Sequence, residues 1–355
     1  MAYYNLKETE KRLEAVRKIL KEKALDAALI YFDELNVANG WYLTGWCGQF
    51  EKGSVLVPVE GEPILLGGPE SEPFAKMNAA ITKVRCFPVF MVPDEEYPNA
   101  TIINFKQLNE ELKQEVMGDL VLLSLVGVKV VLVHGGGPEI SDMLKRVGKE
   151  SKFVNGLRVT DEETVEIVQM VLAGKINKNL VNLIHSNGGK AMGLCGVDGH
   201  MIEAKMLNEE LGFVGDVTKV NIEPVEDVLN MGYIPVISTI GCDNEGNTYN
   251  INADTAAAEI AIALQAECLV SMTDICGILE DKDDESTLIQ KITVDEAPKY
   301  FEKGVISGGM IPKISGCIDA IKKGVKKAFV IDGRVHHSIL IEILTDEGIG
   351  TMLTK

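Results

Sequence analysis

The sequence lacks the features on which several protein classes depend. No run approaches the roughly eighteen consecutive apolar residues of a membrane-spanning helix, and the first residues lack the apolar core of a secretory signal peptide. The seven cysteines are scattered and never spaced as C-x-x-C, so neither a disulfide framework nor a zinc-binding motif is indicated. These absences predict a cytoplasmic protein in a reducing compartment, with most cysteines serving as small buried residues.

Positive charge is also scarce. Lysines and arginines number 35 against 53 aspartates and glutamates, which gives a formal net charge of −18. Such an acidic balance argues against nucleic acid and anionic membranes as partners. A site for an anionic substrate must therefore be built from locally placed lysines, arginines and backbone N–H groups.

The chain length of 355 residues favours two domains rather than one. The first hundred residues contain an amphipathic helical pattern followed by short apolar segments that predict strands. The helix is predicted over 7–25 and the strands over 27–31, 54–59, 63–66, 83–87 and 88–92, with 54–59 and 63–66 forming a hairpin. We expect a separate, smaller α/β domain over residues 1–105.

The rest of the chain is organised around residues 129–140, which read K-V-V-L-V-H-G-G-G-P-E-I. The unbroken apolar run predicts a strand buried on both faces of a parallel sheet, and Pro138 and Glu139 suit the first turn of a helix. Gly135, Gly136 and Gly137 lie between them, where backbone N–H groups and a helix N-terminus can hold a phosphate. The same glycines also fit a tight turn that binds no ligand.

Strand and helix patterns continue to alternate beyond this segment. Further strands are predicted at 189–195, 233–238, 268–272 and 327–331, and a helix over 253–264. This alternation predicts a three-layer α/β domain with an open, mostly parallel sheet over residues 106–355. Residues 160–163, T-D-E-E, predict a capping box in which the Thr160 hydroxyl and the Glu163 side chain each satisfy a backbone N–H.

Four segments of this second domain carry residues suited to chemistry: Gly135–Gly137, Arg158, 250–254 and 307–313. Taken singly, Asp254 fits a helix cap, Arg158 a surface ion pair and Lys313 a solvated lysine. Together they supply backbone donors for phosphate, a forked cation for a carboxylate, a lysine for developing negative charge and a carboxylate to orient it. That set is typical of phosphoryl transfer.

Residues 39–45, N-G-W-Y-L-T-G, resemble the N-x-x-Y-L-T-G signature of the N-terminal domain of creatinase, prolidase and Xaa-Pro aminopeptidases. The resemblance covers about residues 5–105 and implies a non-catalytic domain. In that family the peptidase chemistry belongs to a subsequent metal-binding domain with carboxylate and histidine ligands. All five histidines here lie beyond residue 130, and residues 106–355 do not resemble that metal domain, so we expect no metal site and little support for a peptidase-related protein.

Residues 110–351 resemble the acetylglutamate kinases of the amino-acid kinase family. The ordered matches include V-H-G-G-G-P-E, F-V-N-G-L-R-V-T, Y-N-I-N-A-D-T-A-A, T-D-I-C-G and I-S-G-G-M-I-P-K. The resemblance implies a carbamate kinase-like fold and ATP-dependent phosphorylation of the γ-carboxylate of N-acetyl-L-glutamate to N-acetyl-L-glutamyl 5-phosphate, a step of arginine biosynthesis. ATP is then the cofactor, and Mg²⁺ arrives bound with it.

The resemblance also implies roles for particular residues. Gly136 and Gly137 would bind the reacting γ-carboxylate region, and Arg158 and Asn250 the α-carboxylate and its neighbourhood. Lys313 would stabilise the transferring phosphoryl group, while Asp254 would orient the catalytic lysines. The nucleotide would lie along the following residues: Gly135, Thr273, Asp274, Gly308, Gly309 and Lys313.

The chain departs from the family at its first motif, K-x-G-G-N-A-M, which supplies a second catalytic lysine. Residues 101–112 read T-I-I-N-F-K-Q-L-N-E-E-L instead, and Lys106 is the candidate replacement for the lost lysine. Activity is therefore expected to be reduced, and the alternative is a non-catalytic fusion that retains nucleotide, acetylglutamate or arginine binding. Residues 336–351 resemble the branch that L-arginine inhibits, although the helix that this branch usually adds is not found. Both resembled families favour a homodimer.

Overall fold

The structure is a computed structural model that describes residues 6–32, 37–46, 52–68, 71–86, 100–105, 109–281, 284–345 and 348–355. The chain forms two compact units, Met1–Tyr97 and Pro98–Lys355. Each unit has its own sheet and its own hydrophobic core. None of the described helices is long and apolar enough to cross a membrane.

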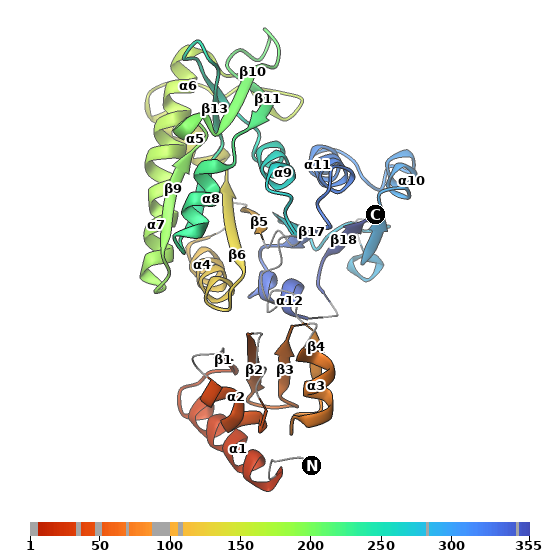
Figure 1. Ribbon diagram of the computed structural model, residues 1–355. Coiled ribbons are helices and arrows are strands. Elements are labelled where there is room, and N and C mark those ends of the chain that lie inside the picture. The colour runs from red at the N-terminus through yellow and green to blue at the C-terminus, as the bar shows by residue number, and fades with distance from the viewer. Residues whose placement is uncertain are drawn as a thin grey trace. The chain divides into compact units, whose positions relative to one another are not determined.

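The first unit is a four-stranded sheet in the order β1-β2-β3-β4, with helices beside it (Figure 1). Its elements are α1 (Leu6–Glu22), β1 (Ala27–Phe32), α2 (Val37–Thr44), β2 (Gly53–Pro58), β3 (Ile64–Gly67), α3 (Ser71–Asn78) and β4 (Val84–Cys86). The predicted hairpin is confirmed, because β2 and β3 pair antiparallel. The strand predicted at 88–92 lies outside the described residues.

The segment 39–45 lies mainly in α2 and helps to build the core of the first unit. Leu43 is buried in that core, and the adjacent Trp46 packs edge-on against Phe32 at 6.5 Å between ring centroids. The Trp46 N–H donates a hydrogen bond to the buried Thr44 hydroxyl at 3.0 Å. The motif therefore includes the end of α2 and contributes Leu43 to the core of the first unit.

The second unit contains an eight-stranded sheet among the described residues, in the order β16-β18-β17-β15-β5-β6-β12-β9. In chain order its strands are β5 (Ala100–Phe105), β6 (Lys129–His134), β9 (Ala191–Cys195), β12 (Ile234–Ser238), β15 (Cys268–Thr273), β16 (Lys291–Thr293), β17 (Lys327–Asp332) and β18 (Thr351–Thr354). Neighbouring strands pair parallel except β17 and β18, which pair antiparallel. The predicted open, mostly parallel sheet is confirmed.

Helices cover both faces of this sheet, which accounts for its strands being apolar on both sides. On one face α9 packs on β5, β6 and β15, and α11 packs on α9 and β17; α4 and α7 belong to the opposite face (Figure 1). Their bounds are α4 (Glu110–Leu125), α7 (Asn177–Ser186), α9 (Ala253–Ala263) and α11 (Met310–Lys322). The other helices are α5 (Gly137–Arg146), α6 (Glu162–Gln169), α8 (Glu223–Asn230), α10 (Ala297–Glu302) and α12 (Ser338–Leu344).

A smaller four-stranded sheet stands beside the large one, in the order β11-β10-β13-β14. Its strands are β10 (Ile202–Met206), β11 (Gly215–Val220), β13 (Ile240–Cys242) and β14 (Thr248–Asn250), and a short hairpin joins β7 (Phe153–Val154) to β8 (Leu157–Arg158). The chain passes from β14 directly into α9. The small sheet therefore carries Asn250 to the start of the helix that bears Asp254.

Two local expectations were incomplete or wrong. The helix that follows Thr160 is capped by Asp161, whose side chain accepts from the Thr164 N–H at 2.9 Å, while the Thr160 hydroxyl donates to the Arg158 carbonyl. The capping box on Thr160 is therefore wrong by one residue. That helix also continues through a π-helical turn, Met170–Ile176, into α7, which the apolar spacing did not reveal.

Candidate active site

Lys313 and Asp254 meet at the carboxyl ends of the central parallel strands. Lys313 comes from the first turn of α11 and Asp254 from the first turn of α9. The Lys313 ammonium donates to Asp254 Oδ1 at 2.5 Å and to the Ser271 hydroxyl at 3.0 Å, and lies 3.4 Å from the Met272 carbonyl. The two side chains retain only 13% and 22% exposure, so this ion pair is partly shielded from water.

Asn104 joins this pair, although no sequence motif indicated it. Its side-chain amide donates to Asp254 Oδ1 at 2.6 Å and lies 3.4 Å from the Ser271 hydroxyl. Asn104 is the fifth residue of β5, and its Cα is in register with Ser271 of the parallel neighbour β15. One signal was present in the sequence: an amide side chain near the end of a buried, mostly apolar strand requires a partner.

The glycine loop lies against the same helix start. A Cβ atom on Gly135 would sit 3.2 Å from the Cβ of Ala253, the residue before Asp254. A Cβ on Gly136 would approach Ile176 Cδ1 within 2.1 Å, whereas one on Gly137 would meet nothing within 4 Å. Gly135 is therefore packed against a Cβ atom that cannot rotate away, whereas the atoms beside Gly136 are the movable ends of side chains; both contacts exist whether or not a ligand binds.

His134, at the end of β6, fixes the orientation of the first peptide of the loop. Its Nδ1 lies 3.0 Å from the Gly135 carbonyl oxygen, and the Asn177 side-chain amide nitrogen lies 3.2 Å from Nε2. Because a carbonyl only accepts and an NH₂ group only donates, the ring carries its proton on Nδ1. Burial lowers the pKa of His134 from 6.5 to about 4, which keeps the imidazole neutral.

The peptide that His134 holds also carries the N–H of Gly136. In a trans peptide the C=O and the following N–H point in opposite directions, so the Gly136 N–H points away from His134. Within the described residues this N–H has no hydrogen-bond acceptor. It is therefore available to an anionic ligand on the far side of the loop.

Arg158 adjoins the other end of the loop. Its guanidinium donates to the Ser151 hydroxyl at 2.6 Å, the Ser141 hydroxyl at 3.0 Å and the Gly137 carbonyl at 2.9 Å. The residue is 6% exposed, and burial lowers its pKa from the ordinary value. No carboxylate pairs with this guanidinium in the part of the chain that the structure describes, so its charge is available to a carboxylate ligand.

The remaining predicted residues occupy varied positions. The Asn250 side-chain amide donates to the Thr160 hydroxyl at 3.3 Å, which links it to the Arg158 backbone. Thr273 ends β15 and is followed by Asp274. Gly308 has a φ of +55°, and with Gly309 it precedes α11 and hence Lys313. Lys106 lies outside the described residues.

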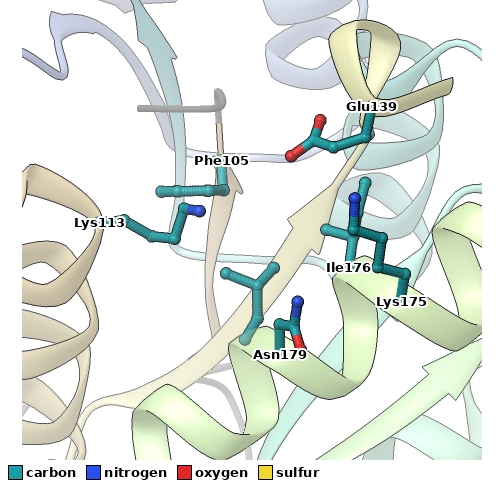
Figure 2. Close-up of a pocket in the computed structure, with 8 residues that line it drawn as sticks. Phe105, Lys113, Glu139, Lys175, Ile176 and Asn179 are labelled. Carbon is teal, nitrogen blue, oxygen red and sulfur yellow. The ribbon is translucent and has the colours of Figure 1, made fainter. Parts of the chain in front are cut away.

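A small pocket of about 40 Å³, open to solvent, lies at the carboxyl ends of β5 and β6 (Figure 2). Among the predicted site residues it is lined by Gly135. Figure 2 shows side chains around it from β5, α4, α5, the π-helical turn and α7, and the lining residues are Phe105, Lys113, Gly135, Glu139, Lys175, Ile176, Asn179 and Leu180. Within the described ranges no group of three or more histidine, cysteine, aspartate or glutamate side chains could hold a metal ion.

Comparison with known proteins agrees with this architecture. Residues 107–332 match the amino acid kinase family. An acetylglutamate kinase from Brachyspira hyodysenteriae is 56% identical over 249 residues, which are 70% of this chain and 86% of that protein. The family match begins at residue 107 and therefore does not include the first unit.

Two solved structures share the fold of the second unit. N-acetylglutamate synthase from Neisseria gonorrhoeae, complexed with coenzyme A and N-acetyl-glutamate, gives a TM-score of 0.63 at 24% identity over 74% of this chain; the match spans 60% of that chain. The carbamate kinase of Giardia gives a TM-score of 0.53 at 15% identity over 72% of this chain and 98% of that chain. These similarities establish the carbamate kinase-like type of the sheet.

Proposed function

Because the chain belongs to the amino acid kinase family, we propose that it transfers the γ-phosphoryl group of ATP to the γ-carboxylate of N-acetyl-L-glutamate. The product is N-acetyl-L-glutamyl 5-phosphate, and the reaction belongs to arginine biosynthesis. The observation that carries the proposal is the 56% identity to an acetylglutamate kinase over 86% of that protein. The protein is accordingly a phosphotransferase with a carboxyl group as acceptor.

In this proposal the two ends of the described site bind different groups of the substrates. We assign the α-carboxylate of the substrate to Arg158, whose buried guanidinium is paired with neutral groups, and to the neighbouring Asn250. The Gly136 and Gly137 N–H groups would then face the γ-carboxylate. Lys313 lies beyond the loop, at the edge of the sheet where the phosphoryl group would pass.

The chain's own residues contribute position and charge rather than covalent chemistry. Asp254 fixes the Lys313 ammonium, and Lys313 neutralises charge that develops on the transferring group. The nucleotide would lie along Gly135, Thr273, Asp274, Gly308 and Gly309. Mg²⁺ bound with ATP supplies further charge neutralisation, and the acidic Asp254 is already occupied by Lys313.

The altered first motif predicts a slow enzyme. Asn104 places a neutral amide beside Asp254, so the described part of the site contains one lysine at this carboxylate. Loss of one charge that stabilises a transition state typically costs about 10²- to 10³-fold in rate. Lys106 remains the candidate for a second cation.

The test is ADP release by purified protein with Mg-ATP and N-acetyl-L-glutamate. We expect turnover that depends on both substrates and is abolished in Lys313→Ala. Lys322→Ala is the matched control, because it removes an exposed lysine from the last turn of the same helix. A folded wild-type protein without turnover would refute the kinase proposal; calorimetric titration with ATP and N-acetyl-L-glutamate would then identify a non-catalytic binding protein.

For the first unit, Met1–Tyr97, we propose a non-catalytic domain of the creatinase and prolidase N-terminal type, joined to the kinase domain from Pro98 onward. The boundary expected after residue 105 moves to this point, because β5 (Ala100–Phe105) is a central strand of the second unit's sheet. The support is the N-G-W-Y-L-T-G segment, whose Leu43 lies in the core of the first unit. Dipeptide hydrolysis that a chelator abolishes would contradict this assignment. We expect no such activity.

Two further proposals concern assembly and regulation. We propose a homodimer, which light scattering coupled to size exclusion would test by giving twice the chain mass of 38.7 kDa.

We also propose L-arginine as an inhibitor, on the resemblance of residues 336–351 to the arginine-inhibited branch. Turnover unaffected by millimolar L-arginine would remove the second proposal.

A further inference from the structure

We propose that Asn104 is a positioning residue for phosphoryl transfer, acting on Lys313 through Asp254 and Ser271. The inference rests on the proposed kinase function and assigns a role to a residue outside the expected site. Asn104 does not need to touch either substrate for this role. It holds the two acceptors that hold the Lys313 ammonium.

The geometry shows one carboxylate oxygen shared by two donors. Asn104 Nδ2 lies 2.6 Å and Lys313 Nζ 2.5 Å from the same Asp254 Oδ1. Both donors also reach the Ser271 hydroxyl, at 3.4 Å and 3.0 Å respectively. The amide and the ammonium therefore contact the same pair of acceptors.

The backbone of a central strand fixes the position of Asn104. Its strand lies in the middle of the sheet, and the Asn104 Cα is in register with Ser271 on one side and Val133 on the other. Asn104 is only 4% exposed. Lys313, by contrast, reaches the group on a long flexible side chain, whose rotamers must be restricted before it can act.

The amide performs a task that an apolar residue cannot perform. The charge-assisted hydrogen bond from the Asn104 amide fixes the direction of the partly buried Asp254 carboxylate. Because the amide is neutral, it stabilises the Asp254 carboxylate without adding a second cation that would repel Lys313. Among the described residues, the result is that Lys313 is held in one position.

The test compares Asn104→Leu, which removes the donor at similar volume, with Asn104→Asp, which keeps the shape and replaces the amide by a carboxyl group. For Asn104→Leu we expect kcat for ADP release to fall about 10- to 100-fold, since a small misplacement of a reacting group has costs of that order. The KM values for ATP and N-acetyl-L-glutamate should change less than about threefold, because in the proposed role Asn104 acts through Asp254 and Ser271 and not on a substrate.

Asn104→Asp gives a readout that a merely structural role would not change. Two adjacent carboxyl groups share a proton, and the protonated form restores a donor toward Asp254. The kcat of this variant should therefore rise as the pH is lowered from about 8 to about 6, whereas wild type and Asn104→Leu should lack this rise. If Asn104→Leu does not fold, Asn104→Asp alone decides by its pH profile.

Three results would overturn the inference. The first is a folded Asn104→Leu variant with kcat within twofold of wild type, and the second is an Asn104→Asp profile identical to wild type. If wild type itself shows no turnover, the kinase proposal fails first, and a crystal structure of Asn104→Leu then decides about Asn104. The third overturning result would be that Lys313 still hydrogen-bonds to both Asp254 and Ser271 in that structure. A displaced Lys313 ammonium would support the positioning role.

Discussion

Replacing His134 by asparagine should remove one source of pH-dependent stability while leaving the glycine loop in place. Asparagine can keep a donor near the position of Nδ1, toward the Gly135 carbonyl, but it does not titrate. The folded-state pKa of His134 is lowered to about 4 from 6.5 by burial. Between these two values the unfolded chain binds a proton that the folded protein does not.

The sign of the pH dependence is set by this difference in pKa. Wild-type stability should rise as the pH increases from about 4 to about 6.5 and should then be constant as far as His134 is concerned. The pKa difference of about 2.5 units corresponds to about 3 kcal/mol in the free energy of unfolding, of which most is lost by pH 4.5. Wild type should therefore lose about 2 to 3 kcal/mol relative to His134→Asn between pH 7.5 and pH 4.5.

The comparison with the variant is necessary because Asp119 acts in the opposite direction. Burial raises the Asp119 pKa to about 6, so its contribution weakens stability as the pH rises from 3.8 to about 6. This contribution is present in both proteins and cancels in their difference. The difference therefore isolates His134.

The assay should report on the second unit alone. Both tryptophans, Trp41 and Trp46, lie in the first unit, so intrinsic fluorescence would report on the wrong part of the chain. Amide hydrogen exchange at Val131 and Leu132 of β6, corrected for intrinsic exchange rates, measures the opening free energy at His134 itself. If the difference in opening free energy between wild type and His134→Asn stays constant from pH 7.5 to pH 4.5, a neutral, buried His134 is refuted.

A second variant tests the assigned tautomer. His134→Phe keeps a ring but cannot donate to the Gly135 carbonyl, so the peptide that carries the Gly136 N–H should lose its fixed orientation. We expect its KM for N-acetyl-L-glutamate to rise about 10-fold above that of His134→Asn, the cost of one good hydrogen bond. Equal KM values for the two variants would contradict the donor role of Nδ1.

Three further substitutions test the site. Arg158→Lys should raise the KM for N-acetyl-L-glutamate about 10- to 100-fold and leave the KM for ATP nearly unchanged, because a lysine lacks the forked donors. Equal increases in the two KM values in steady-state kinetics would contradict the assignment of the α-carboxylate to Arg158. Asp254→Asn should lower kcat about 10²-fold in ADP release with the protein still folded by circular dichroism, whereas unchanged kcat would argue against Lys313 being held by charge. Gly136→Ala should destabilise the second unit by about 0.5 to 1.5 kcal/mol in hydrogen exchange, because the end of the Ile176 side chain must move aside, while Gly137→Ala, with no atom within 4 Å, should not.

The helices and strands of the second unit could be predicted where consecutive residues alone determine the element. An unbroken apolar run such as that of β6 predicts a buried parallel strand, and three glycines followed by Pro138 predict the turn into α5. Lys313 and Asp254, 59 positions apart, were identified by resemblance, and the structure brings them within 2.5 Å. The same segments could not reveal which strand neighbours which, because parallel strands are paired through long connections.

Asn104 shows what this limitation costs. A search for a replacement lysine near the altered motif leads to Lys106, because it is the nearest cation in the sequence. Strand register decides instead which residue contacts Asp254. That register places Asn104 opposite Ser271, where its amide donates to the Asp254 carboxylate. The wrong assignment of the helix cap to Thr160 has a similar cause. Asp161 is an equally good cap by residue type, and its ion pair with Lys149, at 2.6 Å, joins residues 12 positions apart that the local sequence pattern does not connect.

The two ends of the site therefore differ in how much they depart from the family pattern. The proposed substrate end contains the glycine loop and the buried Arg158, so we expect selectivity for an acyl amino acid to be retained. The proposed phosphoryl end contains Lys313 and Asp254, with the neutral amide of Asn104 beside them. In an acidic chain of net charge −18, no general excess of cations compensates for that loss. We therefore expect the altered motif to lower kcat far more than it raises the KM for N-acetyl-L-glutamate.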